Sequence, residues 1–165
     1  MDTPFDLPAR ILFIGIVATL VMDAWLLLLQ RLRVPTLNFA LLGRWAGHLL
    51  RGRVRHEGIA RAAPVRGELA LGWLTHYAVG IAFAGGLVTI LGVRWTHEPR
   101  LLPALGLGVA TVAAPLFVLQ PAMGAGVASW RTATPVRNVL RSVVNHAVFG
   151  VGMYVAAVVF RAITA

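Results

Sequence analysis

Four long apolar runs constrain this chain more than any other feature of its sequence. They cover about residues 9–29, 69–93, 101–120 and 139–160. About 20 residues of helix cross a hydrocarbon core roughly 30 Å thick. Since lipid offers no hydrogen bonds to the backbone, such runs cross as helices. The sequence predicts an all-α polytopic membrane protein, with four transmembrane helices in one bundle and a single domain over residues 1–165.

The composition supports a membrane protein. Hydrophobic residues make up 58% of the 165 residues and charged residues only 13%, whereas an ordinary soluble domain is about 45–50% apolar. The chain has no cysteine, which excludes disulfides and cysteine-based metal sites. The first run is too long for the apolar part of a signal peptide, so we expect a retained span.

The arginines predict the orientation. The net charge is +9, and all 15 basic residues are arginine. Eight lie in the connection 31–68 and three at positions 131, 137 and 141, against four on the other side. The positive-inside rule therefore places this connection on the cytoplasmic side of a bacterial inner membrane, and both termini on the outer side. This distribution also argues against nucleic acid as a partner.

The arginine-rich connection contains a short amphipathic segment, residues 37–50. Leu41, Leu42, Trp45 and Leu49 share one face, which predicts a helix lying in the lipid headgroup layer. An amphipathic helix packed on the protein fits the pattern equally well.

Two sets of side chains in or near the connections carry further expectations. Some arginines are predicted to contact anionic lipid headgroups: Arg44, Arg51, Arg53 and Arg55. Three histidines outside the spans are expected to be solvated: His48, His56 and His97.

Ionisable side chains inside the spans are the main functional candidates. Asp23, His76 and His146 lie in spans one, two and four, with Asn145 beside His146. An aspartate at the centre of a span costs at least ~2.5 kcal/mol, so it normally faces protein, water or a partner. Counted from the flanking charged residues, all three lie roughly 12–14 Å below the cytoplasmic surface.

The third span reaches the same depth at Thr111. Pro115 has no N–H, so the carbonyl of Thr111 loses its helical partner. A neighbouring helix can satisfy this carbonyl and the Thr111 hydroxyl. We expect one intramembrane polar layer to which all four helices contribute.

This layer has several interpretations. It could serve proton-linked or small-solute passage or bind a ligand, or it could be a structural hydrogen-bond network. Asp23, His76 and His146 also match a ligand set for Zn²⁺ or Fe²⁺, and two histidines could hold a haem. No metal-ligand spacing motif supports either group, so no cofactor and no catalytic residue is assigned. The alternatives to passage or ligand binding are an accessory subunit of a larger membrane complex and, less favoured, a membrane enzyme with a bound metal or haem. The chain could also form a homo-oligomer.

Several stretches resemble a bacterial family of four-span membrane proteins, the domain of unknown function 2938 family. They include GIVATLVMD (15–23), GRWAGH (43–48), RGRVRH (51–56), GELALGWLTHYAVGIAFA (67–84), PALGLGVATVAAPLFVLQPAMGAG (103–126) and HAVFGVGMY (146–154). The first and last are also similar to YagU-type inner-membrane proteins. The resemblance implies a fold and a membrane location, and it brings no catalytic residues.

Overall fold

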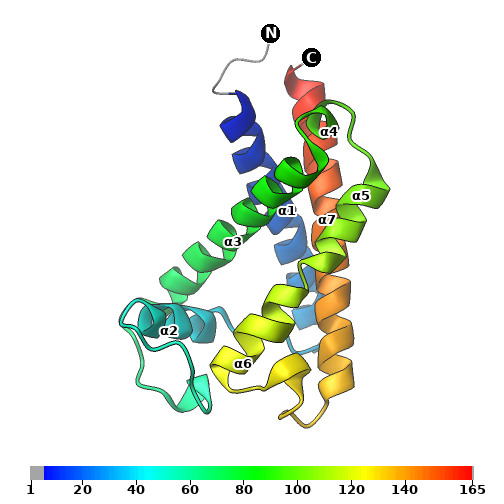
Figure 1. The fold of residues 1–165 in the computed structure, drawn as a ribbon. Helices are drawn as coiled ribbons and strands as arrows, with labels where there is room; N and C mark the ends of the chain where they lie inside the picture. Colours follow the sequence, from blue (N-terminus) through cyan, green and yellow to red (C-terminus); the bar gives the residue numbers. More distant parts are fainter. Residues whose placement is uncertain (1–5, 165) are drawn as a thin grey trace. The chain divides into compact units, whose positions relative to one another are not determined.

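The computed structural model describes residues 6–164 of the chain (Figure 1). Four helical stretches are long and apolar enough to cross a membrane: Leu7–Arg31, Glu68–Leu91, Leu101–Met123 and Pro135–Thr164. The all-helical fold with four spans predicted from the apolar runs is therefore confirmed. Within the described residues the chain forms two compact units, so the expectation of a single domain over 1–165 stays a prediction.

The first unit comprises residues 6–34, 77–111 and 144–164. It contains α1 (Asp6–Arg31), most of α3 (Glu68–Leu91), α4 (Arg94–His97), α5 (Leu101–Ala110) and the larger part of α7 (Pro135–Thr164). Its buried apolar core draws on all of these helices and includes Ile14, Ala18, Ala84, Leu87, Val88, Trp95, Ala104, Phe149, Met153, Ala156 and Ala157.

Glycines let the helices of this unit approach closely. A Cβ on Gly15 of α1 would meet the backbone of Ile81 in α3 at 2.5 Å, and one on Gly108 of α5 would meet Gly150 of α7 at the same distance. Real Cβ atoms do not tolerate such contacts. Small residues at helix crossings permit this packing in membranes, where dispersion contacts replace the hydrophobic effect between helices.

The start of α1 and the end of α7 lie at the same end of the first unit. The guanidinium of Arg10 stacks over the ring of Phe160, 4.9 Å from its centroid. Phe13 meets the same ring edge-on, with centroids 5.2 Å apart. The first and last spans are therefore antiparallel, and the described ends of the chain emerge on one side.

The second unit comprises residues 35–76 and 112–143. It contains α2 (Phe39–Leu49), the 3₁₀ turn η1 (Ile59–Arg61), the first turns of α3 and of α7, and the elements that end the third span. Those elements are η2 (Ala114–Leu119), which is a π-helix, α6 (Gln120–Met123) and the 3₁₀ turn η3 (Val127–Ser129).

The helix α2 corresponds to the amphipathic segment predicted at residues 37–50. It crosses the start of α3 in backbone contact: a Cβ on Gly43 would collide with the carbonyl oxygen of Glu68, and one on Gly72 with that of Phe39. Its buried face also carries Leu42 and Ala46. Of the predicted apolar face only Leu42 is buried, whereas Leu41 and Trp45 are half-buried and Leu49 is exposed. The helix therefore packs on the protein through a different face than the one predicted, and its placement in the headgroup layer stays a prediction.

The third span continues beyond its predicted end at Gln120. Pro121 is tolerated at the start of α6, because the missing N–H of a first-turn residue costs little. The helix instead ends after Met123, where Gly124 adopts a left-handed conformation (φ 97°). Pro115, the earlier proline of this span, lies within the π-helix Ala114–Leu119. The wider helix accommodates its ring, which would clash with the preceding turn of a regular α-helix.

Candidate functional site

The carboxylate of Asp23 in α1 is held by a tyrosine of α3. The Tyr77 hydroxyl donates a hydrogen bond of 2.8 Å to Asp23 Oδ2, and both side chains are half-buried within the first unit. A phenol in a helix exposed to lipid needs a partner for its hydroxyl, and an ionised carboxylate can only accept. The bond therefore gives the Tyr77 hydroxyl and Asp23 Oδ2 a partner inside the spans.

A second hydrogen bond of the first unit joins α5 and α7. Thr111 Oγ1 lies 2.7 Å from His146 Nδ1 and 2.6 Å from the carbonyl oxygen of Gly108. A hydroxyl has one proton, and in a helix it commonly donates to a carbonyl one turn back. If Thr111 donates to Gly108, His146 must carry its proton on Nδ1 and donate to Thr111. The lone pair of a neutral His146 is then on Nε2.

Asn145, the neighbour of His146, also bonds across the first unit. The indole Nε1 of Trp25 donates to Asn145 Oδ1 over 2.9 Å. Trp25 lies two residues after Asp23 in α1. The structure thus brings four predicted residues of the polar layer into contacts between helices: Asp23, Thr111, Asn145 and His146.

His76, the remaining predicted member of the polar layer, belongs to the second unit. Its ring lies 4.8 Å from that of Phe39, centroid to centroid, in a tilted arrangement, and Phe39 in turn stacks on Trp73 at 4.1 Å. Its membership of the layer stays a prediction. Across residues 6–164, no group of three or more His, Asp or Glu side chains could hold a metal ion.

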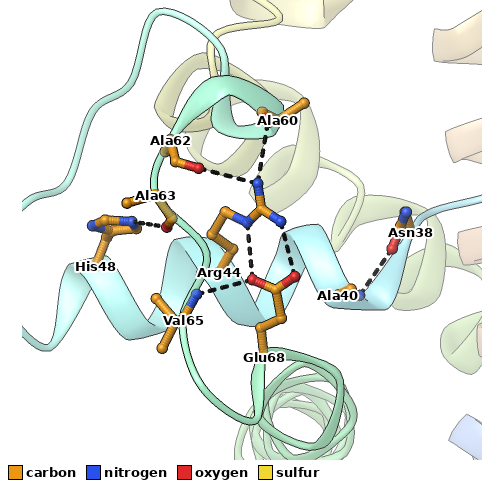
Figure 2. Close-up of polar contacts among 9 residues, drawn as sticks. All are labelled: Asn38, Ala40, Arg44, His48, Ala60, Ala62, Ala63, Val65 and Glu68. Carbon is orange, nitrogen blue, oxygen red and sulfur yellow. Dashed lines mark hydrogen bonds and ion pairs between the residues drawn. The ribbon is translucent and has the colours of Figure 1, made fainter.

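A cluster of polar contacts in the second unit surrounds Arg44 of α2 (Figure 2). Its Nε and Nη2 donate to the two carboxylate oxygens of Glu68, both at 2.9 Å. Its Nη1 donates to the carbonyl oxygens of Ala60 and Ala62, each at 3.1 Å. Such a bidentate pair is stronger and more directional than a single charge contact. Arg44 thereby ties the loop around η1 to the start of α3.

The same cluster is closed by two further bonds (Figure 2). The N–H of Val65 donates to Glu68 Oε2 at 3.1 Å, and His48 Nε2 lies 2.9 Å from the carbonyl oxygen of Ala63. A carbonyl only accepts, so His48 carries a proton on Nε2. The hydrogen bonds between Arg44 and Glu68 are the main reason why the already high pKa of Arg44 is raised further.

Two histidines expected in solvent are buried. His48 and His56 are only 8% and 7% exposed, and their rings meet edge-on at 5.0 Å. The expectation of solvation was wrong for both, because the loop folds back on α2 and covers them. His97, the last residue of α4, is half-buried. Of the arginines predicted to contact lipid, Arg51, Arg53 and Arg55 are exposed, and lipid contact by these three and by Arg44 stays a prediction.

Sequence reasoning missed the partners of the residues it selected. Tyr77 and Trp25 hold two members of the polar layer, and both carry a polar group within an apolar span, which is a usable signal. The pairing of Glu68 with Arg44, 24 positions away, has no signal in local spacing.

The fold and these contacts define the chain as an integral membrane protein with hydrogen-bonded polar side chains inside four helical spans. Residues 12–160 match the family model described as protein of unknown function (DUF2938). The chain belongs to this family, as the resemblance in its sequence indicated. It matches no curated protein and no solved structure. The similarity to YagU-type proteins stays a prediction.

Proposed function

We propose that this protein mediates proton-linked passage across the bacterial inner membrane, with a proton path through its spans that operates without an added solute. The observation that carries the proposal is the pairing of Asp23 with Tyr77, a carboxylate held by a phenol within two adjacent spans. Ionisable residues at membrane depth are expensive to keep and commonly mark ion or proton pathways.

Charge and contacts support an orientation for this function. The connection 31–68 is the arginine-rich side and would be cytoplasmic under the positive-inside rule. The contact between Arg10 and Phe160 places the start of α1 beside the end of α7. This is consistent with both termini lying outside.

In this proposal the two pairs have different roles. Asp23 takes up and releases the proton, and Tyr77 orients its carboxylate. On protonation the carboxyl becomes able to donate a hydrogen bond as well as accept one, so the Asp23–Tyr77 contact can change partners. His146 is a second titratable group in the same unit, and Thr111 fixes the position of its Nδ1.

Infrared difference spectroscopy tests proton exchange at Asp23. The full chain is reconstituted in liposomes, and spectra are recorded at a series of pH values between about 5 and 8. We expect the carbonyl stretching band of a protonated carboxyl to rise and fall in the wild-type protein and to be absent from Asp23→Asn. In Tyr77→Phe the band should shift in frequency, because its hydrogen bond is lost.

The control is Tyr154→Phe in α7, whose hydroxyl has no hydrogen bond to any part of residues 6–164. It should leave the carboxyl band unchanged. A wild-type spectrum without a band that Asp23→Asn removes would reject proton exchange at this site.

A further inference from the structure

The second unit has a pocket that is independent of the polar pairs proposed for transport. It has a volume of about 310 Å³ and is bordered by Arg53, Arg55, His56, Glu57 and Arg61. This volume lies at the lower end of the range of small-molecule sites, ~300–1,000 Å³. The pocket therefore has room for a ligand larger than a single ion.

The wall of this pocket is strongly basic. Three guanidiniums border it against one carboxylate, that of Glu57. Among residues 6–164, no ion pair or side-chain hydrogen bond engages Arg53, Arg55 or Arg61. This contrasts with Arg44 in the same unit, whose guanidinium makes four hydrogen bonds, to Glu68 and to two carbonyls. The pocket arginines thus keep their donors available to a ligand.

His56 supplies a second and independent observation. Its side chain is 93% buried, as its exposure is 7%, yet neither ring nitrogen has a hydrogen-bond partner within the described part of the chain. A neutral imidazole always carries one N–H, and leaving a buried donor unpaired is costly. His56 borders the pocket, and because its ring nitrogens are almost fully covered, a small turn of the ring would bring this donor to an acceptor held there.

The backbone around His56 is firmly placed. Its own N–H donates to the carbonyl oxygen of Ala122 at 2.9 Å. A Cβ on Gly124 would collide with the carbonyl oxygen of Glu57, so the loop and the end of α6 are in direct backbone contact. The pocket is therefore built on a packed segment and is not a chance cluster of surface arginines.

We infer that this pocket binds a phosphate group, with Arg53, Arg55 and Arg61 as charged donors and His56 as a buried donor. One guanidinium can donate two parallel hydrogen bonds to two oxygens of the same phosphate. The phosphate belongs either to a water-soluble phosphomonoester or to the headgroup of a phospholipid such as phosphatidic acid. Both sources present the same doubly charged group to the site.

Ligand-dependent thermal stability of the full chain in detergent tests this inference. One arm compares inorganic phosphate with chloride at equal ionic strength. The other arm compares short-chain phosphatidic acid with phosphatidylcholine in the micelle. A ligand that binds only the folded protein raises Tm with its concentration. The wild-type Tm should rise in a saturable manner in at least one arm, and the arm that responds identifies the source of the phosphate.

Variants distinguish a defined binding site from nonspecific attraction of phosphate to the basic connection. Arg61→Gln and His56→Phe should weaken the apparent affinity about tenfold or more, the loss expected for one charge-assisted hydrogen bond in a site of this kind. Arg66→Gln removes the same charge from the same connection but outside the pocket, and should keep the wild-type response within about twofold.

Two results would overturn the inference: no saturable rise of Tm in either arm, or an equal loss of response in Arg66→Gln and Arg61→Gln. If His56→Phe does not fold, as judged by its Tm in chloride, Arg55→Gln replaces it with the same expectation. The outcome is separate from the transport proposal, since none of these residues belongs to the polar pairs of the spans.

Discussion

Arg44 and Glu68 form a bidentate ion pair between α2 and the first turn of α3, with both nitrogen–oxygen distances at 2.9 Å. Replacing Arg44 by lysine keeps the charge but loses the fork and the bonds to Ala60 and Ala62. We expect Arg44→Lys to lower Tm, and Arg44→Ala to lower it further. Thermal melts monitored by circular dichroism measure both. Equal Tm values for the wild type, Arg44→Lys and Arg44→Ala would show that the Arg44–Glu68 pair does not stabilise the loop.

Gly43 and Gly86 provide a matched test of the helix crossing. An alanine at Gly43 would collide with the backbone of α3, whereas Gly86 in α3 has open space around it. Gly43→Ala should destabilise the protein by about 1–3 kcal/mol, the usual cost of overpacking. Gly86→Ala should be neutral or stabilise it by up to about 1 kcal/mol, since alanine favours a helix. Denaturation in mixed micelles gives both values, and a similar effect of the two changes would contradict the crossing.

His56 predicts a pH dependence of stability. Its pKa is lowered from the ordinary value of 6.5, first by burial and then by the charges of Arg53 and His48. As the pH falls through 6.5, the unfolded chain binds a proton that the folded chain does not. The free energy of unfolding therefore decreases, by at most about 1.4 kcal/mol per pH unit, until the folded pKa is reached.

The variant His56→Gln removes this contribution. In phosphate-free buffer, its Tm should fall less than that of the wild type between about pH 7.5 and 5.5. The other four histidines are common to both proteins and cancel in the comparison. Parallel losses of Tm in the two proteins would show that His56 is not held neutral by the fold.

Thr111 and Thr89 separate a bond between helices from one within a helix. Both hydroxyls lie near a carbonyl of their own helix, at 2.6 and 2.9 Å, but only Thr111 also reaches His146. Thr111→Val should cost about 1 kcal/mol, as for other hydrogen bonds between membrane helices. Thr89→Val should change stability by much less. The nitrogen chemical shifts of the His146 ring should move in Thr111→Val only.

The number and type of the spans could be predicted because a long apolar run has few alternatives as a structure. Span ends were less predictable. The fourth span begins at Pro135 and not near residue 139, since a proline at the first position of a helix is favourable. The third passes Pro121, because the preceding π-helix and a proline-tolerant first turn let it continue to Met123.

The residues of the site were partly accessible from sequence. Asp23 and His146 stand out by their cost in lipid. Tyr77 and Trp25 emerge as the hydrogen-bond partners of Asp23 and Asn145 only when the helices are packed. The burial of His56 depends on a backbone bond to Ala122, 66 positions further along the chain. Contacts between segments so far apart leave no local pattern in a single sequence.

Proton flux into liposomes is the most direct test of the central claim, that the Asp23–Tyr77 pair serves proton-linked passage. Vesicles containing the full chain and an internal pH-sensitive dye receive an inward proton gradient, with the membrane potential clamped by potassium and valinomycin. We predict faster acidification with the wild type and Tyr154→Phe than in empty vesicles, and a return to the empty-vesicle rate with Asp23→Asn. Equal rates for the wild type, Asp23→Asn and empty vesicles would contradict the account.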